Sequence, residues 1–176
     1  MTTWLLDGQT DVQLTAGAIR HPRVSSAPVG SVVRRVVVSA SNGLAQAASV
    51  HLDELVEQPI LRNPDLPDEF MEPFWLGDIR PAEQAHLVSI AAHESREVYE
   101  HVMRAAGVAI VLGAQANAVP TGLRVLPLQG VPPLTLHAAR RADDRRPLVA
   151  SVIRAIHLAS LVRDAPVPTK DLPRSG

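Results

Sequence analysis

Apolar residues recur along this chain in two spacings, one typical of strands and the other of helices. Alternating apolar and polar residues over Asp11–Ala16 predict a half-buried strand. The β-branched run in Val32–Ala40 and the apolar run Val108–Leu112 predict two buried strands. Shorter strands are expected at four further places: Ile60–Leu61, Leu87–Ala91, Leu123–Leu128 and Leu134–Ala139.

Apolar residues three and four apart predict two helices. One covers Val98–Ala106 and ends before Gly107, and the other follows Pro147 with a stripe that starts at Leu148. Trp4–Leu6 is typical of the end of a further helix, and Leu52–Val56 of a single helical turn. Alternating strands and helices predict an α/β protein with a mainly parallel sheet, which binds ligands at the carboxyl ends of its strands.

Fifteen prolines interrupt these patterns and gather in two stretches. Pro59–Pro81 and Pro120–Pro133 are therefore expected to be extended connections between packed elements. The first stretch carries an apolar patch that includes Phe70, Phe74 and Trp75. Residues 164–176 lack a core-forming pattern, and we expect a flexible tail there.

Composition narrows the classes of function. With 17 Lys and Arg against 18 Asp and Glu, the 176-residue chain has no surplus of cations for binding phosphate backbones. Five aromatic residues are too few for a protein that stacks on single-stranded bases. Cysteine is absent, which excludes disulfides and thiolate chemistry and suits a reducing compartment. Neither a signal-peptide pattern nor an apolar run of about 18 residues is present, so we expect a cytoplasmic protein without membrane contact.

Motifs of catalysis are also missing. The sequence contains no glycine-rich nucleotide loop, no nucleophile elbow and no HExxH motif. His93 and His101 lie eight residues apart, too far for a metal-binding pair on one helix. We therefore expect that the protein is not an enzyme and binds neither a cofactor nor a metal ion. An α/β enzyme using His93 or Glu94 as a base is an alternative, but no nucleophile or oxyanion motif accompanies these residues.

Two places offer groups that could hold an anion. After the Asp11–Ala16 strand, the loop Gly17–Arg20 provides a glycine, the amides of Ala18 and Ile19, and the guanidinium of Arg20. The predicted helix start at Glu94, Ser95 and Arg96 offers unpaired N–H groups and a second guanidinium. If these two ends face each other across a cleft, they would form a pocket for a small carboxylate.

The order of segments resembles the effector-binding domain of LysR-type transcriptional regulators. Six short stretches, read from Asp11 to Ser151, are similar in the same order to segments of that family, which we write as DVALV.GPI, ADHPLA, V.L.DLADEPLL, DFWLGDPRP, VAAGLGVALV and WRADDRSPLVRAF. The corresponding stretches here begin at Asp11, Ala40, Val50, Pro73, Val102 and Arg140.

The resemblance implies a type 2 periplasmic-binding-protein-like fold, in which two α/β lobes are joined by two crossover strands. On this basis we expect residues 1–58 and 134–163 to form lobe one and residues 59–133 to form lobe two. An effector would lie in the cleft between the lobes. The resemblance implies effector contacts from Gly17, Ala18, Ile19, Arg20, Asn42, Glu94, Ser95 and Arg96.

Two of these positions depart from the family. Glu94 stands where many members have threonine or serine, and a carboxylate there disfavours an anionic effector unless Arg20 or Arg96 compensates. Asn42 stands in place of the family's histidine. The class of effector therefore stays open, with a small carboxylate as one candidate.

The resemblance covers the chain from about Trp4 to Leu161, without the winged helix-turn-helix or the first strand of lobe one. We expect the Asp11–Ala16 strand to have an unpaired edge, and the chain to pair with another copy or with an intact regulator. The leading hypothesis is an effector-sensing domain that does not bind DNA by itself. The alternative is a stand-alone solute-binding or interaction module that forms mixed dimers with full-length regulators.

Overall fold

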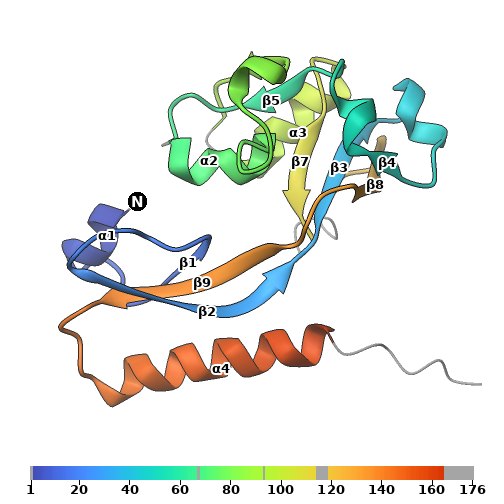
Figure 1. Ribbon diagram of the computed structural model, residues 1–176. Coiled ribbons are helices and arrows are strands. Elements are labelled where there is room, and N and C mark those ends of the chain that lie inside the picture. The colour runs from blue at the N-terminus through green and yellow to red at the C-terminus, as the bar shows by residue number, and fades with distance from the viewer. Residues whose placement is uncertain (1, 67, 93, 114–118, 165–176) are drawn as a thin grey trace, which may run out of the picture.

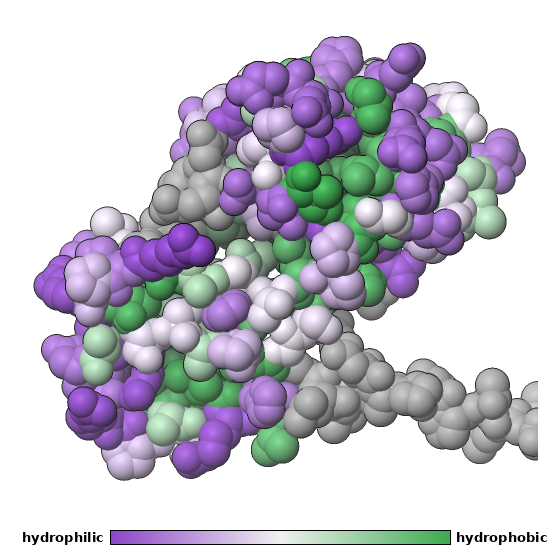
Figure 2. All heavy atoms as spheres, in the orientation of Figure 1, coloured by the Kyte–Doolittle hydropathy of each residue, from purple (hydrophilic) through white to green (hydrophobic). Residues whose placement is uncertain are grey.

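The computed structural model describes residues 2–66, 68–92, 94–113 and 119–164. The chain forms two bodies, which Figure 1 shows one above the other. Figure 2 shows the same division, with hydrophobic side chains reaching the surface of both bodies between polar ones.

The first body, lobe one, is a three-stranded sheet covered by helices. Its strands are β1 (Gln13–Ala16), β2 (Val24–Val32) and β9 (Leu134–Arg141), in the order β1-β9-β2 and all antiparallel. Helix α4 (Pro147–Asp164) packs along β2, and the short α1 (Thr2–Leu6) lies near β9 (Figure 1). As expected, β1 lies at an edge, and its outer side pairs with no strand in the described part of the chain.

The second body, lobe two, contains the remaining strands in two groups. Four strands form one sheet in the order β4-β8-β3-β7, with β3 antiparallel to β7 and β8, and β4 parallel to β8. Strands β5 and β6 pair in parallel, and a bridge from Ile60 to Val108 joins β5 to the start of β7. The strand bounds are β3 (Arg34–Ser39), β4 (Val50–His51), β5 (Ile60–Arg62), β6 (Leu87–Ser89), β7 (Ala109–Leu112) and β8 (Leu123–Gln129).

Helices cover lobe two on both faces of its sheet, because β3 is apolar on both. Val36 and Val38 point into a core completed by Met71 and Trp75 of α2 (Asp68–Trp75). Val37, between them, points into a second core with residues of α3 (Ser95–Met103). Since neighbouring side chains of a strand face opposite sides, this run of valines needs a helix on each side. Three 3-10 helices complete the lobe: η1 (Gly43–Gln46), η2 (Leu52–Leu55) and η3 (Ala82–Gln84).

Two crossovers join the lobes, one between β2 and β3 at Val33 and one between β8 and β9. Arg34, the first residue of β3, is fully buried where they meet. Its Nη1 lies 2.6 Å from the Asp78 carboxylate, and its Nη2 donates to the Pro132 carbonyl over 3.0 Å. This guanidinium therefore ties the returning crossover to lobe two.

Strand pairing differs from the expected division of the chain. Residues 34–51, assigned above to lobe one, contribute β3 and β4, which pair with β7 and β8 of lobe two. The sequence pattern runs through Val33 without a break, whereas the backbone changes sheets there. The expected tail from residue 164 lies outside the described residues, apart from Asp164 at the end of α4.

The expectation of a mainly parallel sheet was wrong. Most pairs are antiparallel, because β2 leaves lobe one and β9 returns to it, so that these neighbours run in opposite directions. Parallel pairing is confined to β4 with β8, β5 with β6, and the bridge from β5 to Val108. Across the described residues, no helix is long and apolar enough to cross a membrane.

Two of the longer elements, β2 and α2, were missed from the sequence, as were the short β4, η1 and η3. Strand β2 has the sequence VSSAPVGSV, whose serines, proline and glycine hide any alternation, and it is stabilised by eight residues paired with β9. Helix α2 lies in the first proline-rich stretch and even contains Pro73. It forms because Met71 and Trp75, four residues apart, bury their side chains in the core. Tertiary packing thus overrides local preference in both cases.

Candidate binding site

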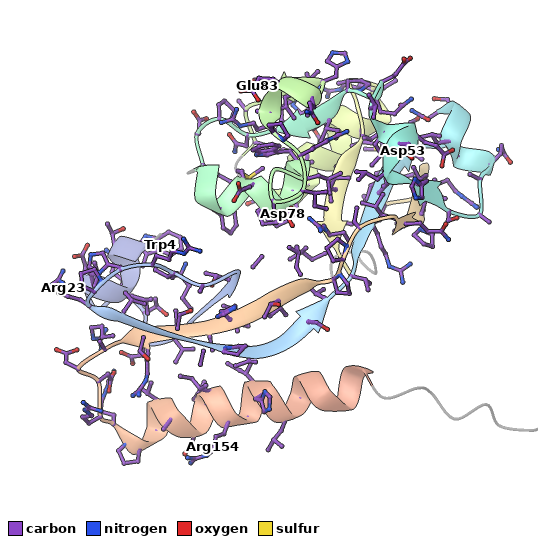
Figure 3. The ribbon with its side chains drawn as sticks, in the orientation of Figure 1. Trp4, Arg23, Asp53, Asp78, Glu83 and Arg154 are labelled. Carbon is purple, nitrogen blue, oxygen red and sulfur yellow. The ribbon has the colours of Figure 1, made fainter. Side chains whose placement is uncertain are left out.

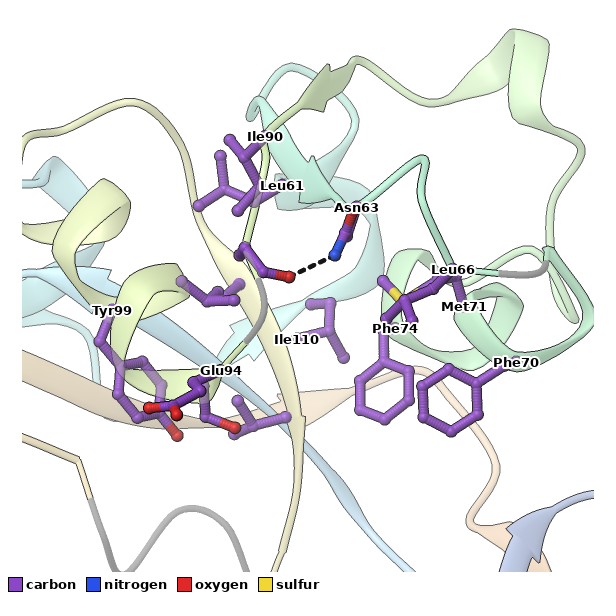
Figure 4. Close-up of a pocket in the computed structure, with 15 residues that line it drawn as sticks. Leu61, Asn63, Leu66, Phe70, Met71, Phe74, Ile90, Glu94, Tyr99 and Ile110 are labelled. Atoms are coloured by element: carbon purple, nitrogen blue, oxygen red, sulfur yellow. Dashed lines mark hydrogen bonds between the residues drawn. The ribbon is translucent and has the colours of Figure 1, made fainter. Parts of the chain in front are cut away.

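Lobe two contains a cavity of about 280 Å³ next to the carboxyl ends of β5 and β6 (Figure 4). Strands β5, β6 and β7 run in the same direction there, so their ends meet at one edge, as expected for ligand sites in α/β folds. Helices α2 and α3 close the sides. The lining residues are Leu61, Asn63, Leu66, Phe70, Met71, Phe74, Ile90, Ala92, Glu94, Ser95, Val98, Tyr99, Ala109, Ile110 and Val111.

One wall of the cavity is aromatic. Phe70 and Phe74 lie one helical turn apart on α2, with ring centroids 5.7 Å apart and ring planes inclined by 43°. Figure 4 shows the two rings side by side, across the cavity from α3. Tilted ring pairs of this kind are suited to hold a flat apolar group.

A buried amide holds the end of the cavity together. Asn63, directly after β5, is 6% exposed. Its Nδ2 donates to the carbonyl of Ala92, drawn as the dashed line in Figure 4, and its Oδ1 accepts from the amide of Asp65 over 3.0 Å. These bonds join the segment after β5 to the segment after β6. We therefore assign Asn63 a structural role in shaping the cavity.

The polar side of the cavity comes from the start of α3. Glu94 is the residue that precedes the helix, and its backbone amide donates to the Glu97 carboxylate. Figure 4 shows Glu94 and Tyr99 on the α3 side of the cavity. Burial raises the pKa of the Tyr99 phenol, so this group stays neutral and can donate a hydrogen bond. Among the described residues that line the cavity, Glu94 is the one that carries a charge.

Two of the eight residues expected to bind an effector line this cavity, namely Glu94 and Ser95. Arg96 does not line it. Its Nη1 lies 3.0 Å from Glu100 on the exposed side of α3. Asn42 also lies elsewhere, where its Oδ1 accepts from the amide of Leu44 at the start of η1.

The four expected residues of lobe one, Gly17–Arg20, form the loop between β1 and β2 and do not line the cavity. The amide of Gly17 donates to the Thr135 carbonyl at the start of β9, over 2.9 Å, which places the loop near the crossovers. Arg20 is exposed. The structure thus places Glu94 and Ser95 at the cavity, turns Arg96 away from it, and leaves the residues of the loop in the other lobe.

Sequence reasoning missed the aromatic wall and Asn63. The spacing of Phe70 and Phe74 would have indicated a helix with an aromatic face, had the prolines around it not favoured an extended chain. Asn63 follows the predicted strand Ile60–Leu61, where parallel strands commonly place polar ligand-binding groups. The alternative base His93 lies outside the described residues. Among those that are described, no cluster of three or more His, Cys, Asp or Glu could hold a metal ion.

Comparison with known proteins places this architecture in a family. Residues 1–159 match the model of the LysR substrate binding domain. A search of curated proteins found no match. Among solved structures, the effector-binding domain of BenM with its effector benzoate has a TM-score of 0.75 at 19% identity, covering 99% of this chain and 80% of that one.

Two further regulatory domains have the same fold. The reduced OxyR domain from Pseudomonas aeruginosa has a TM-score of 0.70 at 18% identity and covers 89% of this chain and 77% of that one. The MetR domain from N. meningitidis has a TM-score of 0.67 at 15% identity and covers 94% of this chain and 76% of that one.

The match to full-length BenM (E226K mutant), with a TM-score of 0.74 at 19% identity, covers 95% of this chain but 56% of that one. This chain therefore spans about half of that regulator. Its two lobes, two crossovers and lobe-two cavity form a periplasmic-binding-protein-like fold, and the chain belongs to the LysR substrate-binding domain family.

Proposed function

We propose that this chain is the effector-sensing domain of a LysR-type transcriptional regulator and that the lobe-two cavity holds the effector. The observation that carries this proposal is a preformed apolar cavity of about 280 Å³, with a small polar side, at the carboxyl ends of parallel strands. A cavity of this size suits a small molecule with a single ring.

The position of the cavity links binding to the arrangement of the lobes. Helix α2, which carries the aromatic wall, is the helix of lobe two that approaches β1 of lobe one. The loop Gly17–Arg20 follows β1, so a movement of lobe one toward α2 would bring it to a bound effector. Binding more tightly to the closed arrangement would then shift the population toward it, which is the signal.

We infer that the preferred effector is an apolar molecule whose polar end is neutral or cationic. The benzoate of the BenM complex is a carboxylate, but here Glu94 places a negative charge in the cavity, and the described residues that line it include no Arg, Lys or His. A carboxylate would meet a like charge there, unless Arg20 reached the ligand from lobe one.

Three molecules of nearly the same shape test this inference: benzoate, benzamide and benzamidine, with charges of −1, 0 and +1. Calorimetric titration of the whole chain should show the tightest binding for benzamidine, weaker binding for benzamide and the weakest for benzoate. The dissociation constants of benzamidine and benzoate should differ by about tenfold. Glu94→Gln should remove most of that difference, whereas Glu57→Gln, at an exposed position outside the cavity, should leave it unchanged.

Tightest binding of benzoate in both the wild-type chain and Glu94→Gln would contradict the inferred charge preference and favour the small carboxylate. If none of the three protects the cavity residues in hydrogen exchange at millimolar concentration, the cavity is not the site for a ligand with one ring.

We also propose that the chain self-associates and does not bind an operator alone. The free outer edge of β1, with Leu14 half exposed on it, supports pairing with another copy or with an intact regulator. Sedimentation should show a concentration-dependent dimer, and an electrophoretic assay at physiological salt should show no sequence-specific shift. A mixed dimer with a co-expressed full-length regulator, in place of a homodimer, would favour the alternative of an interaction module.

A further inference from the structure

Arg80 carries the least satisfied charge in the described part of lobe two. It lies between α2 and η3 and is 7% exposed. Its Nε, Nη1 and Nη2 are all buried, and none of them has a hydrogen-bond partner. Arg34 offers a contrast, since that buried guanidinium donates to Asp78 and Pro132. A guanidinium has five N–H donors, and burying it without a partner is strongly unfavourable.

Arg80 is one of the residues that line a hollow on the surface of lobe two. The other residues that line this hollow are Val56, Glu83, Gln84, Ala85 and His86. None of them lines the effector cavity. Figure 3 labels Glu83 on the side of lobe two that faces away from lobe one. The hollow is therefore a second place, distinct from the cavity described above.

We infer that this hollow binds a compact oxyanion, a phosphate group or a carboxylate, on the guanidinium of Arg80. The planar fork of a guanidinium matches two oxygens of such a group, and the charge-assisted bonds would supply the missing partners. Burial lowers the pKa of Arg80, which reflects the cost of keeping this charge away from water. The site goes beyond the proposed effector function and does not depend on it.

The neighbouring side chains allow entry and complete the site. Gln84 and His86 can donate further hydrogen bonds, and both are exposed. Glu83 carries the opposing charge, and it too is exposed, so it can turn outward to water. Because the guanidinium nitrogens are covered in the free chain, binding requires these surface side chains to move apart. That movement leaves the core intact, since the backbone of His86 is held by the amide of Ile60 over 2.8 Å.

The experiment compares sodium phosphate, sodium acetate and sodium chloride at equal ionic strength, with the melting temperature of the whole chain as the readout. Phosphate, acetate or both should raise it by about 2–4 °C more than chloride in the wild type. The two salts distinguish a phosphate site from a carboxylate site. Arg80→Met should lose this increase, and Arg154→Met, at an exposed arginine of α4 in the other lobe, should keep it.

Two further variants separate a binding site from a structural residue. Without an oxyanion, Arg80→Met should melt at the same temperature as the wild type or higher, because an unpaired buried charge is replaced by an apolar side chain. Glu83→Gln should bind phosphate or acetate at least threefold more tightly. The inference is overturned if neither phosphate nor acetate raises the melting temperature more than chloride does, or if the increase persists in Arg80→Met. It is also overturned if Arg80→Met and Glu83→Gln both lower the melting temperature, because this would show that the two residues pair with each other.

Discussion

At the scale of single residues, buried charges decide where this chain is fragile. Arg34 and Asp144 both have side chains almost fully removed from solvent, and both are surrounded by partners of opposite charge or by carbonyls. Such groups contribute little while paired, but each becomes costly when its partner is removed. Two predictions follow from this asymmetry.

Replacing Asp78 by alanine should destabilise the domain by about 2–3 kcal/mol, because it leaves the Arg34 guanidinium buried with only the Pro132 carbonyl as a partner. The figure is below that for a fully buried pair because the Asp78 side chain is 28% exposed. Urea unfolding measures the change. Asp143→Ala, at an exposed aspartate, is the control and should have no effect beyond about 0.5 kcal/mol.

Asp144 should make stability depend on pH in the acid range. Hydrogen bonds from the Arg146 side chain, the nearest at 2.6 Å, are the main cause that lowers the Asp144 pKa well below its ordinary 3.8. A carboxyl whose pKa is lowered by folding stabilises the protein above its ordinary value, and that contribution is lost as pH falls through the folded value. The difference in melting temperature between wild type and Asp144→Asn should therefore be largest above about pH 5 and should shrink steadily as pH falls below 4. A difference that stays constant down to pH 3 would contradict this.

At the scale of elements, close contacts where two elements meet affect stability more than the secondary-structure propensity of single residues. The run from Arg140 to Arg146 is dense in charged residues, and within it Arg141 bonds to the carbonyls of Leu5 and Thr10 and to the carboxylates of Asp11 and Asp144. This charged run therefore fastens α1 to the end of β9. The sequence shows that this run is rich in arginine and aspartate, whereas only the contacts show that these residues join two elements.

Gly107, between α3 and β7, should not tolerate a side chain. A Cβ there would lie 2.5 Å from the Pro59 carbonyl oxygen, which also accepts the bond from the Val108 amide. Gly107→Ala should cost about 1–3 kcal/mol in urea unfolding, as overpacking does elsewhere. Gly113→Ala, whose Cβ would meet its nearest atom at 3.4 Å, is the matched control. Equal effects of the two substitutions would show that the junction can relax.

At the scale of the whole molecule, two crossovers join the lobes, and Arg34 anchors the returning one to lobe two (Figure 1). We propose that the lobes move relative to each other about these crossovers. Ligand contacts divided between the lobes would couple binding to that movement. The proposed effector cavity lies in lobe two, and its helix α2 approaches lobe one. Binding to the cavity and closure of the lobes can therefore be measured as two separate events.

Phe74→Ala should weaken the binding of benzamide by about tenfold, because it removes one ring of the aromatic wall. In X-ray scattering, saturating benzamide should lower the radius of gyration of the wild type, and the variant should need correspondingly more ligand for the same change. Leu158→Ala, at an exposed leucine of α4, should behave like the wild type. Binding without any change in the radius of gyration would contradict lobe closure.

The sequence by itself determined the elements that residue spacing or local backbone preference can identify. The valine run of β3 and the glycine that follows α1 each indicate their structure in the sequence, the first by its β-branched residues and the second by a backbone conformation that favours glycine. The sequence also predicted helix α4, but its expected apolar stripe is buried only in part: Val149 is buried, whereas Leu148 and Val152 are 75% and 40% exposed. The order of short family-like segments indicated the fold, because topology follows the order of elements. Glu94 and Ser95, which the sequence led us to expect as effector contacts, line the lobe-two cavity, and their role in binding stays a prediction.

Only the tertiary structure decided where the chain changes lobes, that a proline-rich stretch becomes α2, and which groups share one cavity. These features depend on contacts between residues far apart in sequence, such as Arg34 with Pro132 and Asn63 with Ala92. Such a contact stabilises the protein only when the fold has brought both partners together. The spacing of residues along the chain therefore does not predict it.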